Sequence, residues 1–315
     1  MNEYDVVVIG GGAAGLGGAL ALVRARRSVL VIDEGTPRNA PAEHVHNYLT
    51  RDGVSPAELY ALGRAEVTGY GGEVRTGTVT AVTPRGDRFE VETADGTVVR
   101  ARRLLVTTGL ADELPGVPGL AERFGRDVLH CPYCHGWEVR DQAIGVLATG
   151  GMAIHQAMMF RQWSDDITLF LNDGPEPTEQ HWEELAARGI SVVQGKVAAV
   201  EVTDDKLSGV RLEDGKVVAC QALVVQPRAT ARAAFLEGLG LKPAEVEANG
   251  VSMGTAIPAE PGGKTAVPGV WVAGNVADPR AQVISSAAAG LAAAAAINGD
   301  LIEEETRLAV AARSS

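Results

Sequence analysis

The N-terminal stretch DVVVIGGGAAGLGGALALVRARRSVLVID is the feature that most constrains how this chain can fold. It contains an apolar run, three glycines spaced as Gly10-x-Gly12-x-x-Gly15, a helical pattern, and a second apolar run that ends at Asp33. This order predicts a buried strand, a tight turn, a helix and a parallel strand. Gly10 permits the tight turn, Gly12 lets a pyrophosphate approach the backbone, and Gly15 lets the helix pack closely on the strand. With phosphates at the helix N-terminus and Asp33 placed to bind a ribose hydroxyl, the stretch predicts a dinucleotide-binding unit.

The same pattern occurs a second time farther along the chain. Residues 143–173 again read as strand, glycine turn, helix and strand. Each stretch is followed by alternating β-type residues, 72–109 after the first and 190–227 after the second, in which GTVTAV matches GKVAAV. Turn residues such as Gly86-Asp87 predict hairpins within these segments. The duplication predicts an α/β protein with two Rossmann-like dinucleotide-binding domains.

A third segment, residues 267–298, contains a further predicted strand and helix near the C-terminus. It reads as a short apolar strand that ends at Gly274-Asn275, followed after a loop by a small-residue helix that begins near Gln282. The alanine run between residues 287 and 296 predicts a helix packed tightly on a neighbour. Only the turn and the start of the helix are expected to face a cofactor.

The decapeptide CPYCHGWEVR, which contains Cys131, Cys134 and His135, lies just before the second unit. C-x-x-C-H fits three sites: a covalently attached haem, half of a zinc site, or a redox disulfide. Haem attachment generally follows export, and the N-terminus has no basic region of the kind that precedes a signal peptide. A structural zinc site usually takes four ligands, and no second C-x-x-C or C-x-x-H pair is present. A redox disulfide is therefore the favoured interpretation.

Charge and hydropathy limit the partners. The formal net charge is −12 with no cluster of Lys and Arg, so a nucleic acid is not an expected partner. No apolar run is expected to reach the ~18 residues of a membrane span, and a cytoplasmic protein is expected.

Over essentially its whole length, the chain resembles the low-molecular-weight thioredoxin reductases. The resemblance rests on the first glycine fingerprint with Asp33, the TTG motif at residues 107–109, the C-x-x-C before the second unit, and the C-terminal AGN…AQVISSA. It implies a discontinuous FAD-binding domain, residues 1–113 and 242–315, and a middle domain of pyridine-nucleotide type, residues 114–241, that carries the disulfide. It also implies a homodimer.

FAD is the cofactor that the resemblance implies. The residues expected to bind it are Gly10, Gly12, Gly15, Asp33, Glu34, Thr108, Gly109, Gly274, Asn275, Gln282 and Val283. Asn275 stands where the family usually has Asp. In the loop after Asp33, Arg38 is expected at the phosphates or adenosine of FAD, and His46-Asn47 near the flavin edge.

The second glycine fingerprint departs from the family. Its first glycine is replaced by Ala148, whose methyl group is expected to crowd the turn. The following strand ends at Asp173 without an arginine for a 2′-phosphate, although Asp173 itself is placed to hold the ribose of NADH. We therefore expect no pyridine nucleotide to be used, with NADH and NADPH as the alternatives.

This eroded site and the CPYCHG stretch resemble the gliotoxin- and holomycin-type dithiol oxidases. That resemblance implies an enzyme that closes an intramolecular disulfide in a small dithiol. Electrons would pass through Cys131 and Cys134 to FAD and then to dioxygen, giving hydrogen peroxide. Two alternatives remain open: an NAD(P)H-dependent disulfide reductase, and a flavoprotein that senses redox state without turnover.

The resemblance assigns roles around the thiol pair. Cys131 is the interchange sulfur, and Cys134 lies against the flavin as the charge-transfer thiolate. His135 stands where thioredoxin reductases carry a proton-donating Asp, and we expect it to be the general base. Tyr133 and Trp137 are expected to line a substrate pocket or to pack in the core. Three further residues are expected to take no part in the chemistry: Cys220, His155 and His181.

Overall fold

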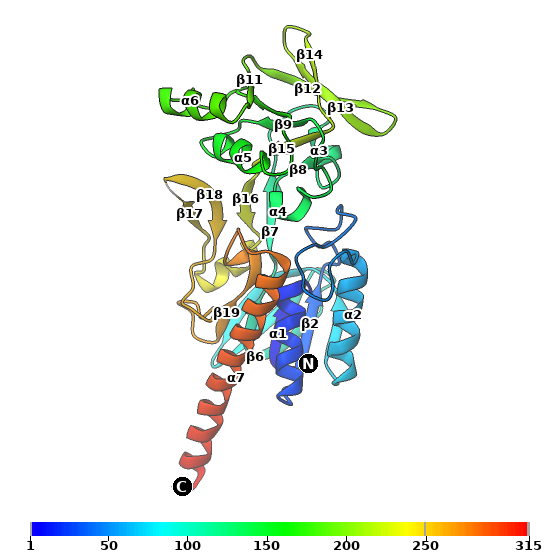
Figure 1. The fold of residues 1–315 in the computed structure, drawn as a ribbon. Coiled ribbons are helices and arrows are strands. Elements are labelled where there is room, and N and C mark those ends of the chain that lie inside the picture. Colours follow the sequence, from blue (N-terminus) through cyan, green and yellow to red (C-terminus); the bar gives the residue numbers. More distant parts are fainter. Residues whose placement is uncertain (1, 249, 314–315) are drawn as a thin grey trace.

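The computed structural model describes residues 2–248 and 250–313. Two α/β units lie one above the other, with a small sheet between them (Figure 1). The first unit contains both the N-terminal and the C-terminal segments, drawn in blue, cyan and red. The middle unit is drawn mainly in green. The expected pair of Rossmann-like domains is confirmed.

The first unit is built on a seven-stranded sheet in the order β3-β2-β1-β6-β5-β4, with β19 paired to β6. The strands are β1 (Glu3–Ile9), β2 (Val29–Asp33), β3 (Glu73–Thr76), β4 (Val79–Arg85), β5 (Arg88–Thr93), β6 (Val98–Val106) and β19 (Val270–Val272). β1 is parallel to β2, with Val6 opposite Val29, and parallel to β6, with Val8 opposite Leu105. The β4–β5–β6 meander is antiparallel and turns at Gly86-Asp87, as predicted.

Three helices cover one face of this sheet: α1 (Ala13–Arg24), α2 (Pro56–Gly69) and α7 (Val283–Arg313). Small residues let α1 and α7 come very close, since a Cβ at Gly290 would lie 2.0 Å from the carbonyl oxygen of Ala14. The alanine run therefore packs on a neighbour, as expected, and the N-termini of both helices open on the same side.

The length and composition of α7 correct one expectation. Over its 31 residues this helix is long and apolar enough to cross a membrane, whereas no such segment was expected. Its Gly290, Ala293, Ile297 and Leu301 are buried, and Ile297 and Leu301 belong to the core that α1 also forms. This half of the helix is thus built to pack against protein.

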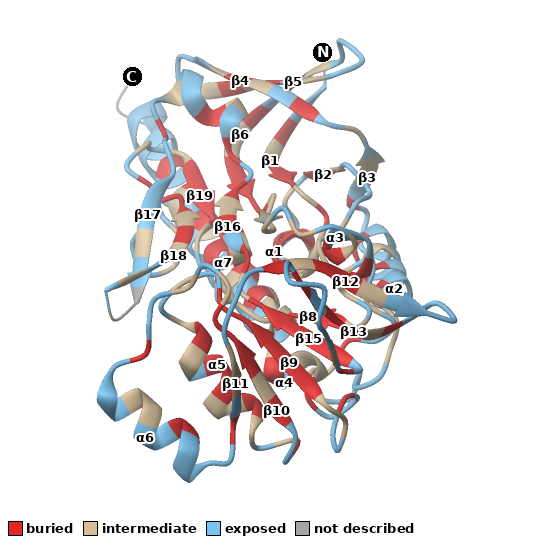
Figure 2. Ribbon diagram, turned by 90° about the horizontal axis from the view of Figure 1, so that it is seen from above, coloured by how far each residue is buried: buried red, intermediate tan, exposed pale blue. Residues whose placement is uncertain are grey.

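The middle unit repeats the architecture on a smaller scale. Its five-stranded sheet has the order β11-β10-β9-β15-β8, and a three-stranded sheet β12-β13-β14 lies beside it. The strands are β8 (Val128–Leu129), β9 (Ile144–Leu147), β10 (Ile167–Phe170), β11 (Ser191–Val193), β12 (Val197–Thr203), β13 (Lys206–Leu212), β14 (Val217–Ala219) and β15 (Ala222–Val225). The helices are α3 (Leu120–Arg123), α4 (Pro132–His135), α5 (Ala153–Phe160) and α6 (Glu179–Ala187). The central strands β9 and β15 are buried along their whole length (Figure 2).

The chain crosses between the units through a four-stranded sheet, β17-β18-β16-β7. Its strands are β7 (Leu110–Glu113), β16 (Arg228–Ala231), β17 (Ala244–Ala248) and β18 (Val251–Ala256). A short 3₁₀ helix, η1 (Ala234–Leu239), follows β16. Ala231, Leu236 and Leu241 pack in the core of the first unit, so the chain has already returned there at β16. The expected boundary between residues 241 and 242 is therefore too late.

Candidate active site

One large cavity lies between the two units and is lined by both. Its volume is about 1090 Å³, slightly above the ~300–1,000 Å³ usual for small-molecule and cofactor sites. All but two of the expected site residues line it: Gly10, Gly12, Asp33, Glu34, Arg38, His46, Thr108, Gly109, Cys131, Cys134, His135, Gly274, Asn275, Gln282 and Val283. The cavity thus brings the first glycine turn and the thiol pair together.

The first glycine turn presents an uncapped helix start to the cavity. Gly12 is the N-cap of α1, and no side chain caps the helix there. A Cβ at Gly12 would meet nothing within 4 Å, whereas one at Gly15 would lie 1.9 Å from the carbonyl oxygen of Gly10. Gly15 is therefore a packing residue outside the lining, while the turn at Gly12 is open. Asp33 Oδ1 accepts a 2.8 Å hydrogen bond from the N–H of Gly11. Free N–H groups at the positive end of a helix favour an anion, so the turn fits the pyrophosphate of FAD.

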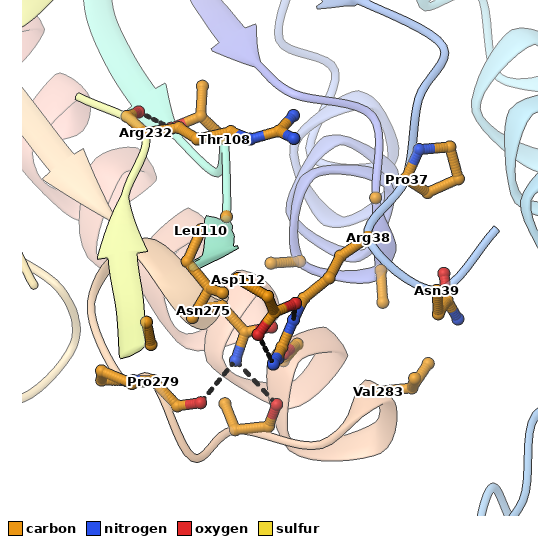
Figure 3. Close-up of a pocket in the computed structure, with 18 of the residues that line it drawn as sticks. Pro37, Arg38, Asn39, Thr108, Leu110, Asp112, Arg232, Asn275, Pro279 and Val283 are labelled. Carbon is orange, nitrogen blue, oxygen red and sulfur yellow. Dashed lines mark hydrogen bonds and ion pairs between the residues drawn. The ribbon is translucent and has the colours of Figure 1, made fainter. Parts of the chain in front are cut away.

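The start of α7 is held at the cavity by Asn275 (Figure 3). Asn275 Nδ2 donates to the backbone carbonyls of Asp278 at 3.1 Å and of Ala281 at 2.9 Å. The amide hydrogens are therefore used inside the loop that leads to Gln282. An Asp at this position has no N–H to donate, so the departure from the family's residue has a local structural consequence.

Arg38 makes a contact that was not expected. Its Nε and Nη2 donate to the two carboxylate oxygens of Asp112, at 2.7 and 2.6 Å (Figure 3). Arg38 was expected at the phosphates or adenosine of FAD, but a bidentate pair of this kind holds its guanidinium against β7. The pair lines the cavity at the crossing between the units.

The thiol pair lies at the start of α4. Cys131 is the N-cap of this helix, and both cysteines are free thiols. The pKa of Cys131 is lowered to about 7, because the Cys134 thiol donates a hydrogen bond to it and the backbone N–H groups of Cys134 and Tyr133 point at its sulfur. The pKa of Cys134 is raised, because its proton is held in the hydrogen bond to Cys131 and because the thiol is buried. These surroundings favour a thiolate on Cys131, as an interchange sulfur requires, while the charge-transfer role of Cys134 stays a prediction.

His135 follows the pair directly and lines the same cavity. Both of its ring nitrogens are buried and have no hydrogen-bond partner among the described residues. Burial lowers the pKa of His135, so the imidazole is neutral at neutral pH. An unprotonated imidazole beside two thiols has the chemistry of a proton acceptor.

The sequence motifs did not point to a second histidine of the site, His130. It precedes Cys131 and lines the cavity. Burial, and then the positive charge of Arg38, lower its pKa to about 4. Its place next to the C-x-x-C was visible in the sequence, but only the fold shows that its ring is enclosed near Arg38.

The loop after β2 contacts the thiol segment across the two units. Asn47 Nδ2 donates a 2.5 Å hydrogen bond to the backbone carbonyl of Tyr133. His46 lies between two carboxylates, with Nε2 3.3 Å from Glu138 and Nδ1 3.5 Å from Asp52. Asn47 is therefore a residue of the contact between the units and not of the cavity lining.

The two aromatic residues beside the pair differ. Tyr133 lines the cavity and meets the ring of Trp163 edge to face. Trp137 is 65% exposed and lies under the guanidinium of Arg140, outside the cavity lining, so neither expectation for it is met. Cys220 is buried, and burial raises its pKa to about 12, as suits a structural thiol.

Residues 148–151 of the second glycine turn do not line the cavity, whereas Met152 at the end of the turn does. Ala148 is buried in the core of the middle unit, so its methyl group points inward and not at a phosphate. A Cβ at Gly151 would lie 3.3 Å from Val251 of β18, which places the first unit against the turn. Asp173 pairs with Lys196 at 3.0 Å.

The helix after this turn lines the cavity instead. Met152, His155, Gln156 and Met159 contribute to the wall, and none was expected there. His155 thus belongs to the site, although no role was expected for it. His181 belongs to the capping box of α6, a purely structural part.

Comparison with known proteins agrees with this architecture. The family model for pyridine nucleotide-disulphide oxidoreductases matches residues 4–294. The chain is 31% identical over 312 residues to thioredoxin reductase sirT of Leptosphaeria maculans, which covers 94% of this chain and 93% of that protein. It is 33% identical over 231 residues to a probable thioredoxin reductase of Arthroderma benhamiae, which covers 68% of this chain but only 55% of that longer protein.

Among solved structures, the crystal structure of HlmI superposes with a TM-score of 0.92 at 46% identity, covering 98% of this chain and 96% of that one. The chain therefore belongs to the pyridine nucleotide-disulphide oxidoreductase family, in its thioredoxin reductase-like branch of flavoproteins.

Proposed function

We propose that this protein is an FAD-dependent dithiol oxidase that closes an intramolecular disulfide in a small dithiol, with dioxygen as the electron acceptor. One observation carries the proposal: the thiol pair shares a cavity with the intact first glycine turn, while residues 148–151 of the second glycine turn lie outside the lining of that cavity. The cavity gives a thiol substrate a route to the pair, and Ala148 in place of the first glycine of the second turn supports the absence of pyridine-nucleotide use. The resemblance to holomycin-type dithiol oxidases supports the same direction of electron flow.

The residues of this chain suit the thiol exchange steps. In the oxidised enzyme, a substrate thiolate attacks the Cys131 sulfur, the Cys131–Cys134 bond breaks, and Cys134 leaves as a thiolate. The second substrate thiolate then attacks the substrate sulfur of the mixed disulfide and releases Cys131. His135 would take the proton of the incoming thiol. Its lowered pKa and its two ring nitrogens, which have no hydrogen-bond partner among the described residues, support this role. The substrate loses two electrons and two protons, and the protein disulfide becomes a dithiol.

The first unit would hold the cofactor through the open turn at Gly12, Asp33 and the start of α7. FAD, when bound there, would supply the two-electron acceptor for the Cys131–Cys134 dithiol, with dioxygen as the final acceptor and hydrogen peroxide as its product. A homodimer that acts in the cytoplasm completes the proposal.

Anaerobic mixing tests the direction of electron flow. The FAD-loaded protein should lose its visible flavin absorbance with dithiothreitol and keep it with NADPH or NADH. In air, each disulfide formed should be matched by one hydrogen peroxide. Rapid loss of absorbance with NADPH would overturn the proposal in favour of a disulfide reductase. A flavin that dithiols reduce without turnover in air would favour a redox sensor.

The variant Cys134→Ser links the reaction to the pair. It cannot form the protein disulfide, so dithiol oxidation should stop while FAD stays bound. Cys220→Ser is the matched control, because this thiol is buried away from the cavity, and it should keep full activity. Retained oxidation in Cys134→Ser would remove the pair from the reaction.

A further inference from the structure

The middle unit keeps a ligand crevice even though residues 148–151 of its glycine turn lie outside the cavity lining. β9 lies at the centre of the sheet, with β10 on one side and β15 on the other. After β9 the chain moves outward to β10 and β11 on one side, and it then crosses to β15 on the other side, so the strand order reverses between β9 and β15. In open parallel sheets, ligands bind outside the carboxyl ends of the strands at such a reversal. Gln226, which follows β15, marks this point, and it lines the cavity.

One face of α5 forms the wall of this crevice. Met152, the N-cap of α5, lines the cavity together with His155, Gln156 and Met159 of the helix, at the spacing of residues that share a helix face. The buried Gln156 is anchored, since its Nε2 donates to Gln226 Oε1 at 3.1 Å. The methionines are only partly buried, so their thioethers are available to a ligand.

The first unit supplies the opposite wall. Phe235 of η1 and Met253 of β18 line the same cavity. In Figure 1, β16 and β18 lie to the left of α4, and the loop that follows β2 lies to its right. The thiol pair lines the same cavity as the residues at the ribose and phosphate end and those at the α5 end. We call the latter end the α5 chamber, formed by Met152, His155, Gln156, Met159, Phe235 and Met253.

The α5 chamber contains no Asp, Glu, Lys or Arg. Methionine and phenylalanine offer polarisable, apolar surface, and an unpaired charge buried against such a surface is strongly disfavoured. The phosphate end, by contrast, has the uncapped start of α1. The two ends of one cavity thus present different surfaces, free N–H groups at one end and mainly apolar side chains at the other.

We propose that the α5 chamber, a former nucleotide crevice, holds the non-sulfur part of the substrate and selects an uncharged dithiol over a charged one. The inference rests on the proposed function and adds to it the location and the charge class of the substrate. It names Met253 and Met159 as residues that determine specificity, one from each wall.

Dihydrolipoamide and dihydrolipoate provide a matched pair of probes, because they share the same dithiol and differ by one negative charge. The FAD-loaded wild-type protein should oxidise dihydrolipoamide with a kcat/KM at least about tenfold higher. In Met253→Lys, a cation in the chamber should bring that ratio to one or below. Ser252→Lys is the control, since Ser252 is exposed on the same strand and outside the cavity lining, and it should keep the wild-type ratio.

A second variant and a binding measurement on the wild type ensure that the test does not depend on whether Met253→Lys folds. Met159→Lys should shift the ratio in the same direction from the other wall. Calorimetry with oxidised lipoamide and lipoate should show the same preference without turnover. Equal kcat/KM for the two probes in the wild type, or equal shifts of the ratio in Met253→Lys and Ser252→Lys, would overturn the assignment of the α5 chamber as a substrate site. Either result would leave the proposed dithiol oxidase activity intact. No oxidation of either probe or of dithiothreitol would instead overturn the proposed function.

Discussion

Asn47 Nδ2 donates a 2.5 Å hydrogen bond to the backbone carbonyl of Tyr133, and so ties the first unit to the segment between the two reactive cysteines. The neighbouring His46 faces Glu138 of the middle unit at 3.3 Å. These contacts lie beside α4 and hold the thiol pair over the cavity. They favour one orientation of the two units, the one in which the pair faces the first glycine turn.

Removing the Asn47 side chain should weaken this orientation. Asn47 has φ +59°, where glycine is unstrained, so Asn47→Gly removes the hydrogen bond without backbone strain. A net loss of one neutral hydrogen bond corresponds to about a two- to tenfold effect. Anaerobic flavin reduction by a dithiol should slow by that factor, with FAD content unchanged. Asn47→Asp, which keeps the shape but cannot donate at neutral pH, should slow it equally; an Asp variant with wild-type rates would exclude the hydrogen bond as the cause.

The two cysteines should differ in reactivity in the reduced protein. The pKa of Cys131 is lowered to about 7 by the Cys134 thiol and by backbone N–H groups, so Cys131 is a thiolate above that pH and a thiol below it. Alkylation of Cys131 by iodoacetamide should therefore rise through pH 7 and level off above it, as followed by peptide mass spectrometry. Cys220, whose pKa burial raises to about 12, is the internal control and should stay unmodified. Faster labelling of Cys134 than of Cys131 would reverse the assignment of the interchange sulfur.

The features of this molecule that can be predicted from its sequence are those that a single short stretch of the chain determines. Gly12 and Asp33 belong to one strand–turn–helix–strand unit, so their spacing alone predicts how they meet. Arg38 and Asp112 pair across 74 positions, and no periodicity in the chain links them. The same holds for Val251 against Gly151, which depends on how the units are oriented. Ala148 in place of the first glycine predicts an eroded turn, but the residues of α5 that line the cavity follow only from that orientation.

His135 should give the reaction a pH dependence that is absent when His135 is replaced by Gln. Burial lowers its pKa, so the free base, which accepts the proton, persists to below the usual pH of about 6.5 for histidine. The kcat/KM of the wild type should therefore fall only on the acid side of that value. His135→Gln should lower kcat/KM by about 10²-fold, as is usual for the loss of a general base, and should abolish the acid limb. His181→Gln, on α6 and away from the cavity, is the control; a His135→Gln variant that keeps the acid limb would assign the proton to another group.

The glycines of the first turn should separate cofactor binding from folding. A Cβ at Gly12 meets nothing within 4 Å, whereas a Cβ at Gly15 would lie 1.9 Å from the carbonyl oxygen of Gly10. Gly12→Ala should therefore leave the melting temperature of the apoprotein unchanged but weaken FAD binding by at least about tenfold, because the methyl group occupies the approach of the pyrophosphate. Gly15→Ala should lower the stability of the apoprotein by about 1–3 kcal/mol or more, as overpacking does, and should reduce FAD binding only as a consequence. Thermal unfolding of both apoproteins, with FAD titration followed by flavin fluorescence, distinguishes the two effects. Equal loss of apoprotein stability in the two variants would show that the Gly12 turn is a packing feature and not a cofactor cradle.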